Sequence, residues 1–533
     1  MLLVIAGLAT TSCKKNGDES ENGSETDPKV DGLVFVENGI NYIGNGDRNH
    51  YVQKGDFELD ASKTYILRGW VYIQDGSTMT IPAGTIIKGQ YNKTPELGGA
   101  SLIIEPGAKI FARGTAEKPV VFTSQQAPGS RKPCDWGGVI ILGKGRNNLS
   151  RQAIEGGPAS AEGVTPQHGW HGGDDDNDNS GVFCYVRIEF AGYPFAENAE
   201  INGLTLGSVG KATELHHVQV SYAGDDSFEW FGGSVDCKYL VAYHGWDDDF
   251  DTDNGFSGTL QFLLGVRHPK IADQSTSNGF ESDNNANGST ATPFTAARFS
   301  NVTLVGPIGQ DVNFANNVDY INAGNLKPVD AVGVGRFQAG VQIRRNSCIS
   351  LTNSVIIGYP VGLVVENDKG SQTQTFADGN TLISNVFFGG YSDNAADATV
   401  NNTAANPSTI LGSDRNNTWQ DTYSDDGTDW TAPGTKSFSH TYVLKSGLNN
   451  VITATIDELM LNNPRSTTDG SFTYYSSANY GPKSGSPLIN AAFTVPSGFD
   501  AAGNGYAGAF KSDNDSDNWL RGWTNFDPQN TAY

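Results

Sequence analysis

A short acidic motif occurs three times between residues 224 and 284. The copies read DDSFE, DDDFD and SNGFE, and they can be aligned on a shared phenylalanine. Each copy has an acid directly after this phenylalanine, and the second and third copies add another acid two positions later. The candidate ligand or cation face therefore consists of Asp226, Glu229, Asp251, Asp253, Glu281 and Asp283.

Stacking of the three copies would bring like charges together. Equivalent residues of stacked strands lie about 4.8 Å apart, so Glu229, Asp251 and Glu281 would repel one another. Bound cations, neighbouring Lys or Arg side chains, or proton uptake with raised pKa values can each offset this repulsion. Two interpretations stay open: a face that binds a cation or ligand, and a structural ladder bonded to backbone turns.

A second acidic group lies in a polar segment, residues 146–180. Asp174, Asp176 and Asp178 alternate as oxygen ligands do in calcium loops, although the flanking helices of an EF-hand are missing. Two interpretations stay open: a Ca²⁺ site and a solvated acidic turn. His168 and His171 form an HxxH pair without a helical context or a third ligand, so a catalytic zinc site is not expected.

The elements that must position these acids are short strands. Residues 184–190, 217–222 and 239–243 are rich in β-branched and aromatic residues, and a glycine follows each run. Motifs repeating every 22 to 30 residues, with no helical pattern between them, are typical of stacked turns. We therefore predict an all-β protein, a right-handed, single-stranded parallel β-helix (solenoid) with long loops and a C-terminal cap.

The chain divides into four predicted parts. Residues 1–13 are an export signal, residues 14–60 a polar tether and N-terminal cap, residues 61–495 the β-helix with loop insertions at 146–180 and 392–478, and residues 496–533 the C-terminal cap. Asn301, Asn353 and Asn385 precede comparable strands, which indicates a structural asparagine ladder. Trp519, Trp523 and Phe526 are expected to cover the last open turn or, alternatively, to bind sugar rings.

The N-terminal residues indicate export. An apolar run ends in LATTSC, which resembles a bacterial lipobox in which Cys13 would be acylated; an ordinary secretion signal is the alternative. Acids outnumber bases by 59 to 35, and the resulting net charge of −24 makes nucleic acid an unfavourable partner. A divalent cation or a cationic partner suits this charge better; the alternative is that the acids of a large exposed protein serve solubility alone.

Several longer phrases resemble one protein family. GAKIFARGTAEKPVVFTS, DWGGVIILGK, VSYAGDDSFEWFGG and GWDDDFDTDNGFSG look like a widespread family of exported bacterial, Bacteroidota-type, right-handed parallel β-helix surface lipoproteins. The resemblance spans about residues 63–526 and implies a lipid-anchored protein on the outer face of the outer membrane. It implies no established activity; many such proteins look like accessories of outer-membrane transport systems.

A catalytic interpretation competes with binding. Polysaccharide lyases of this architecture use calcium-binding carboxylates and an arginine base, and RHPK at residues 267–270 partly resembles their RxPxxR motif, with Ala272 in place of the second arginine. Glycosidases need paired carboxylates. The catalytic candidates are Arg267, Asp248 and Asp249.

The combined expectation is a surface-exposed outer-membrane lipoprotein that acts as a binding or interaction module, with a TonB-dependent nutrient transporter as the candidate partner to which it is an accessory. A calcium-dependent polysaccharide lyase or glycosidase acting on the Asp-rich face is the first alternative, and a passive surface-layer or adhesion component is the second. The expected cofactor is Ca²⁺, and a polysaccharide is a candidate ligand.

Overall fold

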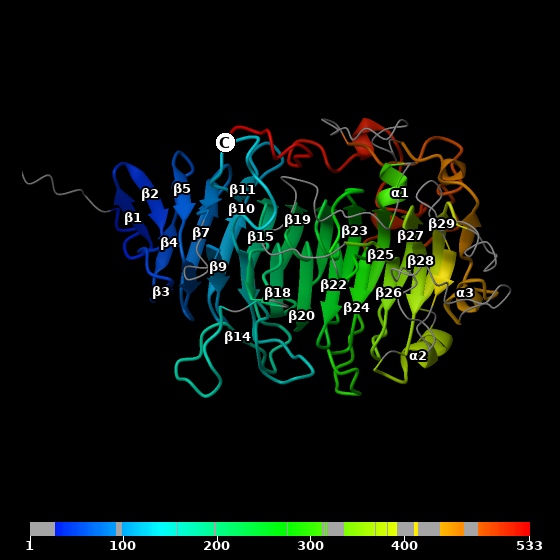
Figure 1. The fold of residues 1–533 in the computed structure, drawn as a ribbon, viewed down its shortest axis with the longest axis horizontal. Helices are drawn as coiled ribbons and strands as arrows, with labels where there is room; N and C mark the ends of the chain where they lie inside the picture. The colour runs from blue at the N-terminus through cyan, green and yellow to red at the C-terminus, as the bar shows by residue number, and fades with distance from the viewer. Residues whose placement is uncertain are drawn as a thin grey trace, which may run out of the picture.

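Two long sheets of mostly parallel strands form a β-helix (Figure 1). The computed structural model describes residues 27–91, 99–156, 158–196, 199–273, 275–311, 314, 316, 335–367, 369–380, 382–391, 410–413, 438–462 and 478–533. Each strand pairs with the equivalent strand of the next turn, and apolar side chains from both sheets share one core. The prediction of an all-β parallel β-helix is confirmed.

The strands fall into the two sheets as follows. The first sheet contains β1 (Val34–Glu37), β2 (Ile40–Ile43), β4 (Asp56–Glu58), β5 (Thr64–Leu67), β7 (Thr78–Pro82), β8 (Ile86–Gly89), β10 (Lys109–Arg113), β11 (Val120–Ser124), β15 (Gly181–Glu189), β19 (Glu214–Ser221), β21 (Cys237–Tyr243), β23 (Thr259–Val266), β25 (Arg298–Val305), β27 (Ser350–Ile357), β29 (Ile383–Gly389) and β31 (Val451–Thr453). The second sheet contains β3 (Asn49–Val52), β6 (Trp70–Ile73), β9 (Ser101–Ile104), β12 (Gly138–Leu142), β18 (Leu204–Val209), β20 (Phe228–Gly233), β22 (Phe250–Asp253), β24 (Phe280–Ser282), β26 (Ala339–Ile343), β28 (Val361–Val365) and β30 (Ile410–Ser413).

Short elements occupy the connections. Two small hairpins pair β13 (Gln152–Ala153) with β14 (Trp170–His171) and β16 (Pro194–Ala196) with β17 (Ala199–Glu200). The helical segments are α1 (Pro307–Gln310), α2 (Thr373–Asn380), α3 (Phe438–Val443), η4 (Ile456–Leu459), η5 (Ala501–Gly503) and η6 (Asp515–Asp517). None of the helices in the described ranges is long and apolar enough for a membrane span.

The long strands of the first sheet bend at one residue per turn. β10 pairs with the first half of β15 and β11 with its second half, so β15 joins two strands that are separate in the preceding turn. The joining residue has a left-handed backbone, with φ between 48° and 63° in the column Tyr185, His217, Tyr239, Phe262, Asn301, Asn353 and Asn385. The predicted asparagines thus lie at this bend.

The solenoid begins earlier and ends differently from the prediction. β3 and β4 already pair in parallel with the next turn, so residues 49–58 belong to the β-helix rather than to the predicted tether and N-terminal cap. The antiparallel hairpin β1–β2 lies at the N-terminal end of the first sheet. Residues 1–26, including Cys13, lie outside the described residues.

Residues 478–533, here called the C-terminal strap, do not cap the last turn. They run back along the first sheet (Figure 1) and end beside β8 and β15, where Lys88 Nζ donates to the carbonyl of Tyr533 at 2.9 Å and the Tyr533 hydroxyl donates to Glu189 at 2.6 Å. Trp523 is fully buried with its ring edge-on to Tyr185 and His217, and Phe526 contacts Tyr243. Because Trp523 and Phe526 cover the aromatic outer face of the first sheet, they are closed to sugar rings, contrary to that alternative.

Candidate functional site

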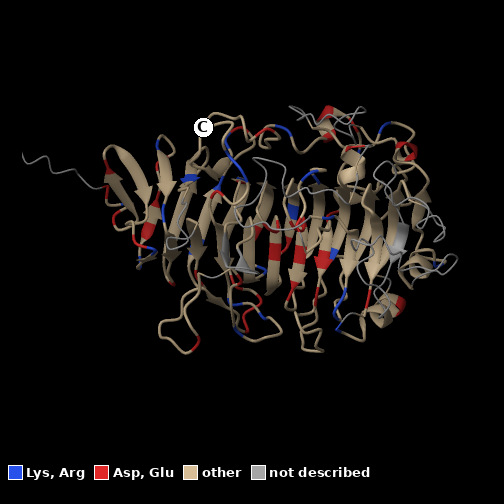
Figure 2. Cartoon of the chain, in the orientation of Figure 1, with Lys and Arg blue, Asp and Glu red and all other residues tan. Residues whose placement is uncertain are grey.

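The three acidic motifs stack on the second sheet. Phe228, Phe250 and Phe280 are in register and buried, and their rings lie 5.5 and 5.3 Å apart between successive turns. The residues that follow, Glu229, Asp251 and Glu281, are therefore in register on the opposite, outer face. Acids lie on neighbouring strands in the middle of this sheet (Figure 2), so the predicted column is confirmed.

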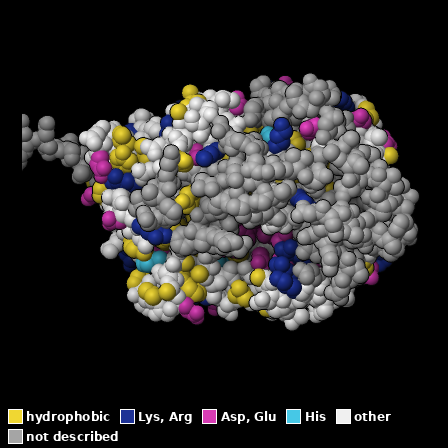
Figure 3. Space-filling model, viewed as in Figure 1, with side chains coloured by type: hydrophobic (Ala, Val, Ile, Leu, Met, Phe, Trp, Pro, Cys, Tyr) yellow, Lys and Arg dark blue, Asp and Glu magenta, His cyan; other side chains and the backbone are white. Residues whose placement is uncertain are grey.

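We call the whole group the acid ladder. It consists of the residues of this column and the other acids of the three motifs except the fully buried Asp249: Asp225, Asp226, Glu229, Asp247, Asp248, Asp251, Asp253, Glu281 and Asp283. On the molecular surface, acidic side chains are visible in a hollow next to a group of Lys and Arg side chains (Figure 3).

Backbone groups hold one edge of the ladder. Asp226 Oδ1 accepts a hydrogen bond from the Asp248 N–H at 2.7 Å, Asp248 Oδ1 accepts from the Asn278 N–H at 2.5 Å, and Asn278 Oδ1 accepts from the Ala339 N–H at 3.0 Å. Each side chain thus ties its turn to the next one. The structural interpretation is correct for one oxygen of Asp226 and one of Asp248, and their other oxygens have no hydrogen-bond partner among the described residues.

Arginines neutralise only one end of the ladder. Arg344 forms ion pairs with Glu281 and, at 2.8 Å, with Asp283, while Arg345 contacts Asp283 at 2.6 Å. At the other end the Asn202 amide, which is neutral, donates to Glu229. Within the described part of the chain no Lys or Arg forms an ion pair with Asp226, Asp247, Asp248, Asp251 or Asp253, which lie between these ends.

These central acids have the spacing of metal ligands. Three overlapping groups each offer oxygens within 4.8 Å of one another: Asp225, Asp226 and Asp247; Asp226, Glu229 and Asp251; and Asp248, Asp251 and Glu281. Two ligands of one Ca²⁺, each about 2.3–2.6 Å from the ion, can have this separation. In addition, Oδ1 of Asp247 and Oδ1 of Asp251 are buried and have no hydrogen-bond partner among the described residues.

Crowding of these acids changes their protonation. Burial raises the pKa values of six of these acids well above their usual range, and neighbouring carboxylates raise them further. The six acids are Asp226, Glu229, Asp247, Asp248, Asp251 and Asp253. Without a cation, the ladder therefore retains protons to higher pH than isolated carboxyl groups would.

The predicted catalytic arginine is closed to substrate. Arg267 and Asp249 are both fully buried and form an ion pair of 2.9 Å, and Arg267 also donates to the Trp246 carbonyl. The Tyr359 hydroxyl donates to the other oxygen of Asp249 at 3.0 Å. The prediction of Arg267 and Asp249 as catalytic residues is wrong because both side chains point into the protein; Asp248 belongs to the acid ladder instead.

The second predicted calcium group is not assembled. Asp176 pairs with Arg146, Asp178 is buried and accepts from the Ser180 hydroxyl at 3.3 Å, and Asp174 is exposed. In the ranges that the structure describes, the groups of three potential ligands close enough for one metal ion all lie in the acid ladder. The alternating acids at residues 174–178 did not predict a metal site correctly, because their side chains do not converge on one point.

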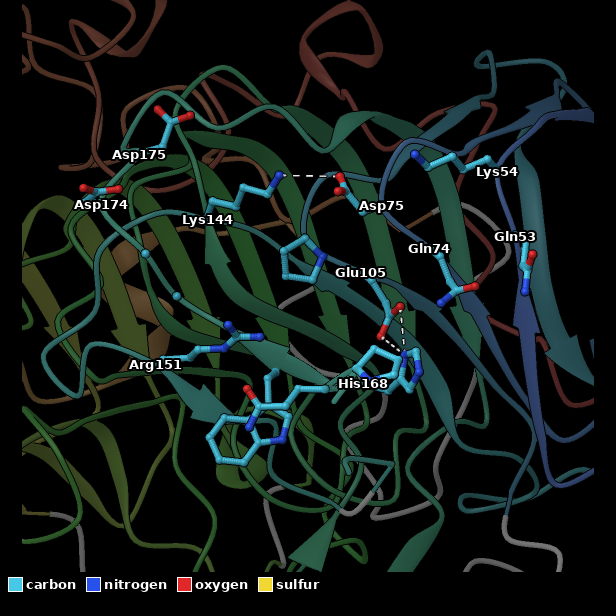
Figure 4. A pocket seen from close by; sticks show the side chains of 16 residues that line it. Gln53, Lys54, Gln74, Asp75, Glu105, Lys144, Arg151, His168, Asp174 and Asp175 are labelled. Atoms are coloured by element: carbon cyan, nitrogen blue, oxygen red, sulfur yellow. Dashed lines mark hydrogen bonds and ion pairs between the residues drawn. The ribbon is translucent and has the colours of Figure 1, made fainter. Parts of the chain in front are cut away.

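The sequence interpretation missed a pocket of about 860 Å³ beneath the 146–180 segment (Figure 4). Gln53, Gln74 and Glu105, which line it, directly follow β3, β6 and β9, and this repeated polar position was the available signal. The two histidines of the HxxH pair bond to different partners: His168 to Glu105 and His171 to Ser208.

One comparison with known proteins supports the fold. A family model described as "Pectate-lyase like beta helix domain" matches residues 51–435. A search of curated proteins found no match. The crystal structure of the Dettilon tailspike protein aligns with 11% identity and a TM-score of 0.24, covering 66% of this chain and 62% of that chain, which is less than two thirds of its length.

Proposed function

Because the chain belongs to the family with a pectate-lyase-like β-helix domain, we propose that its acid ladder holds calcium and thereby binds an acidic glycan. Three overlapping acid groups, with unpartnered buried oxygens on Asp247 and Asp251, carry this proposal. Bound calcium would supply the positive charge to which the carboxylate of a sugar can bind. The protein is then a binding module whose ligand needs the cation.

The donor set favours calcium over transition metals. The three groups offer carboxylate oxygens and no His or Cys side chain. Oxygen-only sites suit hard cations, and Ca²⁺ accepts six to eight ligands in flexible geometry. Each group of three acids therefore leaves ligand positions for water or for a sugar carboxylate.

Binding fits this face better than cleavage. The lyase alternative needs an arginine base at the carboxylates, and the arginine predicted for that role, Arg267, is buried in an ion pair. Arg344 is engaged with two acids of the ladder, so it too is occupied. The proposed role is accordingly capture of the glycan.

Calcium should stabilise the protein through Asp247 and Asp251. Binding at about 100 times the Kd adds about 2.7 kcal/mol to the free energy of unfolding. We expect the melting temperature to rise with CaCl₂ and fall with EDTA. The double variant Asp247→Asn/Asp251→Asn should melt at one temperature in both conditions and should also lose calcium-dependent retention of polygalacturonate in affinity electrophoresis.

Asp174→Asn/Asp175→Asn is the matched control, because it removes the same charge from an exposed turn outside the ladder. This control should keep the full calcium response. A wild-type melting temperature that is indifferent to both calcium and EDTA would contradict the proposal and favour a passive surface component.

The proposed location is the outer face of the bacterial outer membrane. In this proposal Cys13 carries the lipid, the following polar residues form the tether, and the ladder captures glycan beside a TonB-dependent nutrient transporter. The apolar run that ends in Cys13 supports this location. Cys13→Ser should move the protein from the membrane fraction to the soluble fraction; an unchanged distribution on immunoblots would reject the lipid anchor.

A further inference from the structure

A polar column forms the floor of the pocket beneath the 146–180 segment. Val52, Ile73 and Ile104 are in register on β3, β6 and β9, so the residues that follow them, Gln53, Gln74 and Glu105, continue one column with one side chain per turn. The side-chain amides of Gln53 and Gln74 have no hydrogen-bond partner among the described residues. Each amide therefore offers one acceptor and two donors to a ligand.

The wall of the pocket is fixed to this floor. His168 Nδ1 lies 2.9 Å from Glu105 Oε1, and the Gly169 N–H donates to the same oxygen at 3.3 Å. Trp170, which also lines the pocket, donates its indole N–H to the Ser160 carbonyl at 2.8 Å, and this bond sets the orientation of the ring. The pocket is thus preformed, because its wall and floor are already hydrogen-bonded to each other.

Charges of both signs surround the opening. Lys144 lies 3.5 Å from Asp75, and Arg151 and Asp174 come from the 146–180 segment on the side of the pocket away from Gln53 (Figure 4). A mixed lining does not favour a strongly charged ligand, and its polarity does not favour an apolar one. The volume of about 860 Å³ lies within the usual range for small-ligand pockets, about 300–1,000 Å³.

We propose that this pocket binds a neutral sugar unit of a glycan, without a metal ion. The amides of Gln53 and Gln74 can each pair with neighbouring hydroxyl groups, and the Trp170 ring offers an apolar face to the C–H groups of a pyranose. The repeat of one amide per turn, about 4.8 Å, is close to the length of a pyranose unit along a chain. This site lies on β3, β6 and β9, outside the acid ladder of β20, β22 and β24.

A glycan array probed in EDTA tests the proposal. Fluorescently labelled wild-type protein should bind neutral hexose glycans, since no cation is needed. For the tightest-binding neutral glycan, Gln74→Ala and Gln53→Ala should each weaken affinity about tenfold in calorimetric titration, and the double variant should not bind detectably. Both side chains lie at the surface, and unchanged melting temperatures would show that the variants fold.

Two controls separate this site from other effects. Gln125→Ala, at an exposed glutamine outside the pocket, should bind the same glycan as wild type does. Asp247→Asn/Asp251→Asn should also bind it unchanged, so a failure of the calcium proposal leaves this test intact. An array with no bound neutral glycan, or equal affinity for wild type and the Gln53→Ala/Gln74→Ala protein, would overturn the inference.

Discussion

Side-chain direction decides the role of each acid in the repeated motif. Asp249 and Asp251 are two positions apart, yet Asp249 is fully buried against Arg267 and Asp251 lies on the outer face beside Glu229 and Glu281. Phe250 stands between them and points inward. A tight corner before the strand brings Asp249 inside, so simple alternation along the strand does not extend to it.

The sequence was sufficient to predict the outer column but not the buried ion pair. The shared phenylalanines align Glu229, Asp251 and Glu281 directly, because in-register stacking carries any repeated position onto its copy. Arg267 belongs to another strand end, and its meeting with Asp249 depends on how the corner turns. Nothing in the local residue pattern records that geometry.

A buried carboxyl outside the ladder makes stability depend on pH. Asp135 is fully buried and accepts from the Ser124 hydroxyl at 2.5 Å, and burial raises its pKa to about 6. In the unfolded chain the pKa of an aspartate is about 4. Because the folded-state pKa is higher, the stabilising contribution of Asp135 is fully present below about pH 4 and is lost as the pH rises through about 6.

Asp135→Asn should remove this dependence. The free energy of unfolding of wild type, relative to the variant, should decline by about 3 kcal/mol between about pH 4 and pH 7, since one pKa unit corresponds to about 1.36 kcal/mol. Urea denaturation at each pH measures the difference. Parallel curves for the two proteins across this range would show that Asp135 is not the titrating group.

At the scale of strands, the bend column shows what sequence patterns leave out. The β-branched and aromatic runs predicted the strands of the first sheet, and their glycines predicted the turns. They did not predict that each long strand contains a left-handed residue, because Tyr185, Tyr239 and Phe262 are ordinary strand formers by composition. Only the asparagines of the later turns carry a local signal, since Asn tolerates this conformation better than most residues.

Substitution at Asn385 should reveal the cost of the bend. Its φ is 53°, a value that costs most side chains about 1–2 kcal/mol but costs glycine nothing. Asn385→Ala should therefore lower the free energy of unfolding by about 1 kcal/mol, whereas Asn385→Gly should stay within about 0.5 kcal/mol of wild type. Equal losses for Ala and Gly in urea titrations would assign the effect to the lost amide instead.

At the scale of the whole molecule, the C-terminal strap adds contacts that a simple solenoid lacks. Stacked repeats normally touch only their neighbours, and their stability is nearly a sum of local terms. Here the strap contacts turns far apart in the chain: Asn353 and Asn301 near its start, and Gln219 and Glu189 near its end. The aromatic residues of the strap can be identified in the sequence. The surface against which they pack cannot, because it is formed by aromatic side chains on the outer face of the first sheet.

Loss of one buried ring should weaken the strap measurably. Trp523 is fully buried against Tyr185 and His217, and a Trp→Ala change in a core costs about 3–5 kcal/mol. Trp523→Ala should lower the urea midpoint and open the strap to limited proteolysis. Arg521→Ala, two residues away on an exposed side chain, is the control and should change neither measurement.

The strap also limits how this protein can change in length. Its residues contact β27, β25, β23, β21, β19 and β15, through Asn353, Asn301, Gln261, Lys238, Gln219 and Glu189. Inserting or deleting one coil among these strands would displace every later contact by about 4.8 Å. Duplication of one coil, the ordinary route by which repeat proteins lengthen, is therefore disfavoured between β15 and β27. A longer β-helix in this region would also need a longer C-terminal strap.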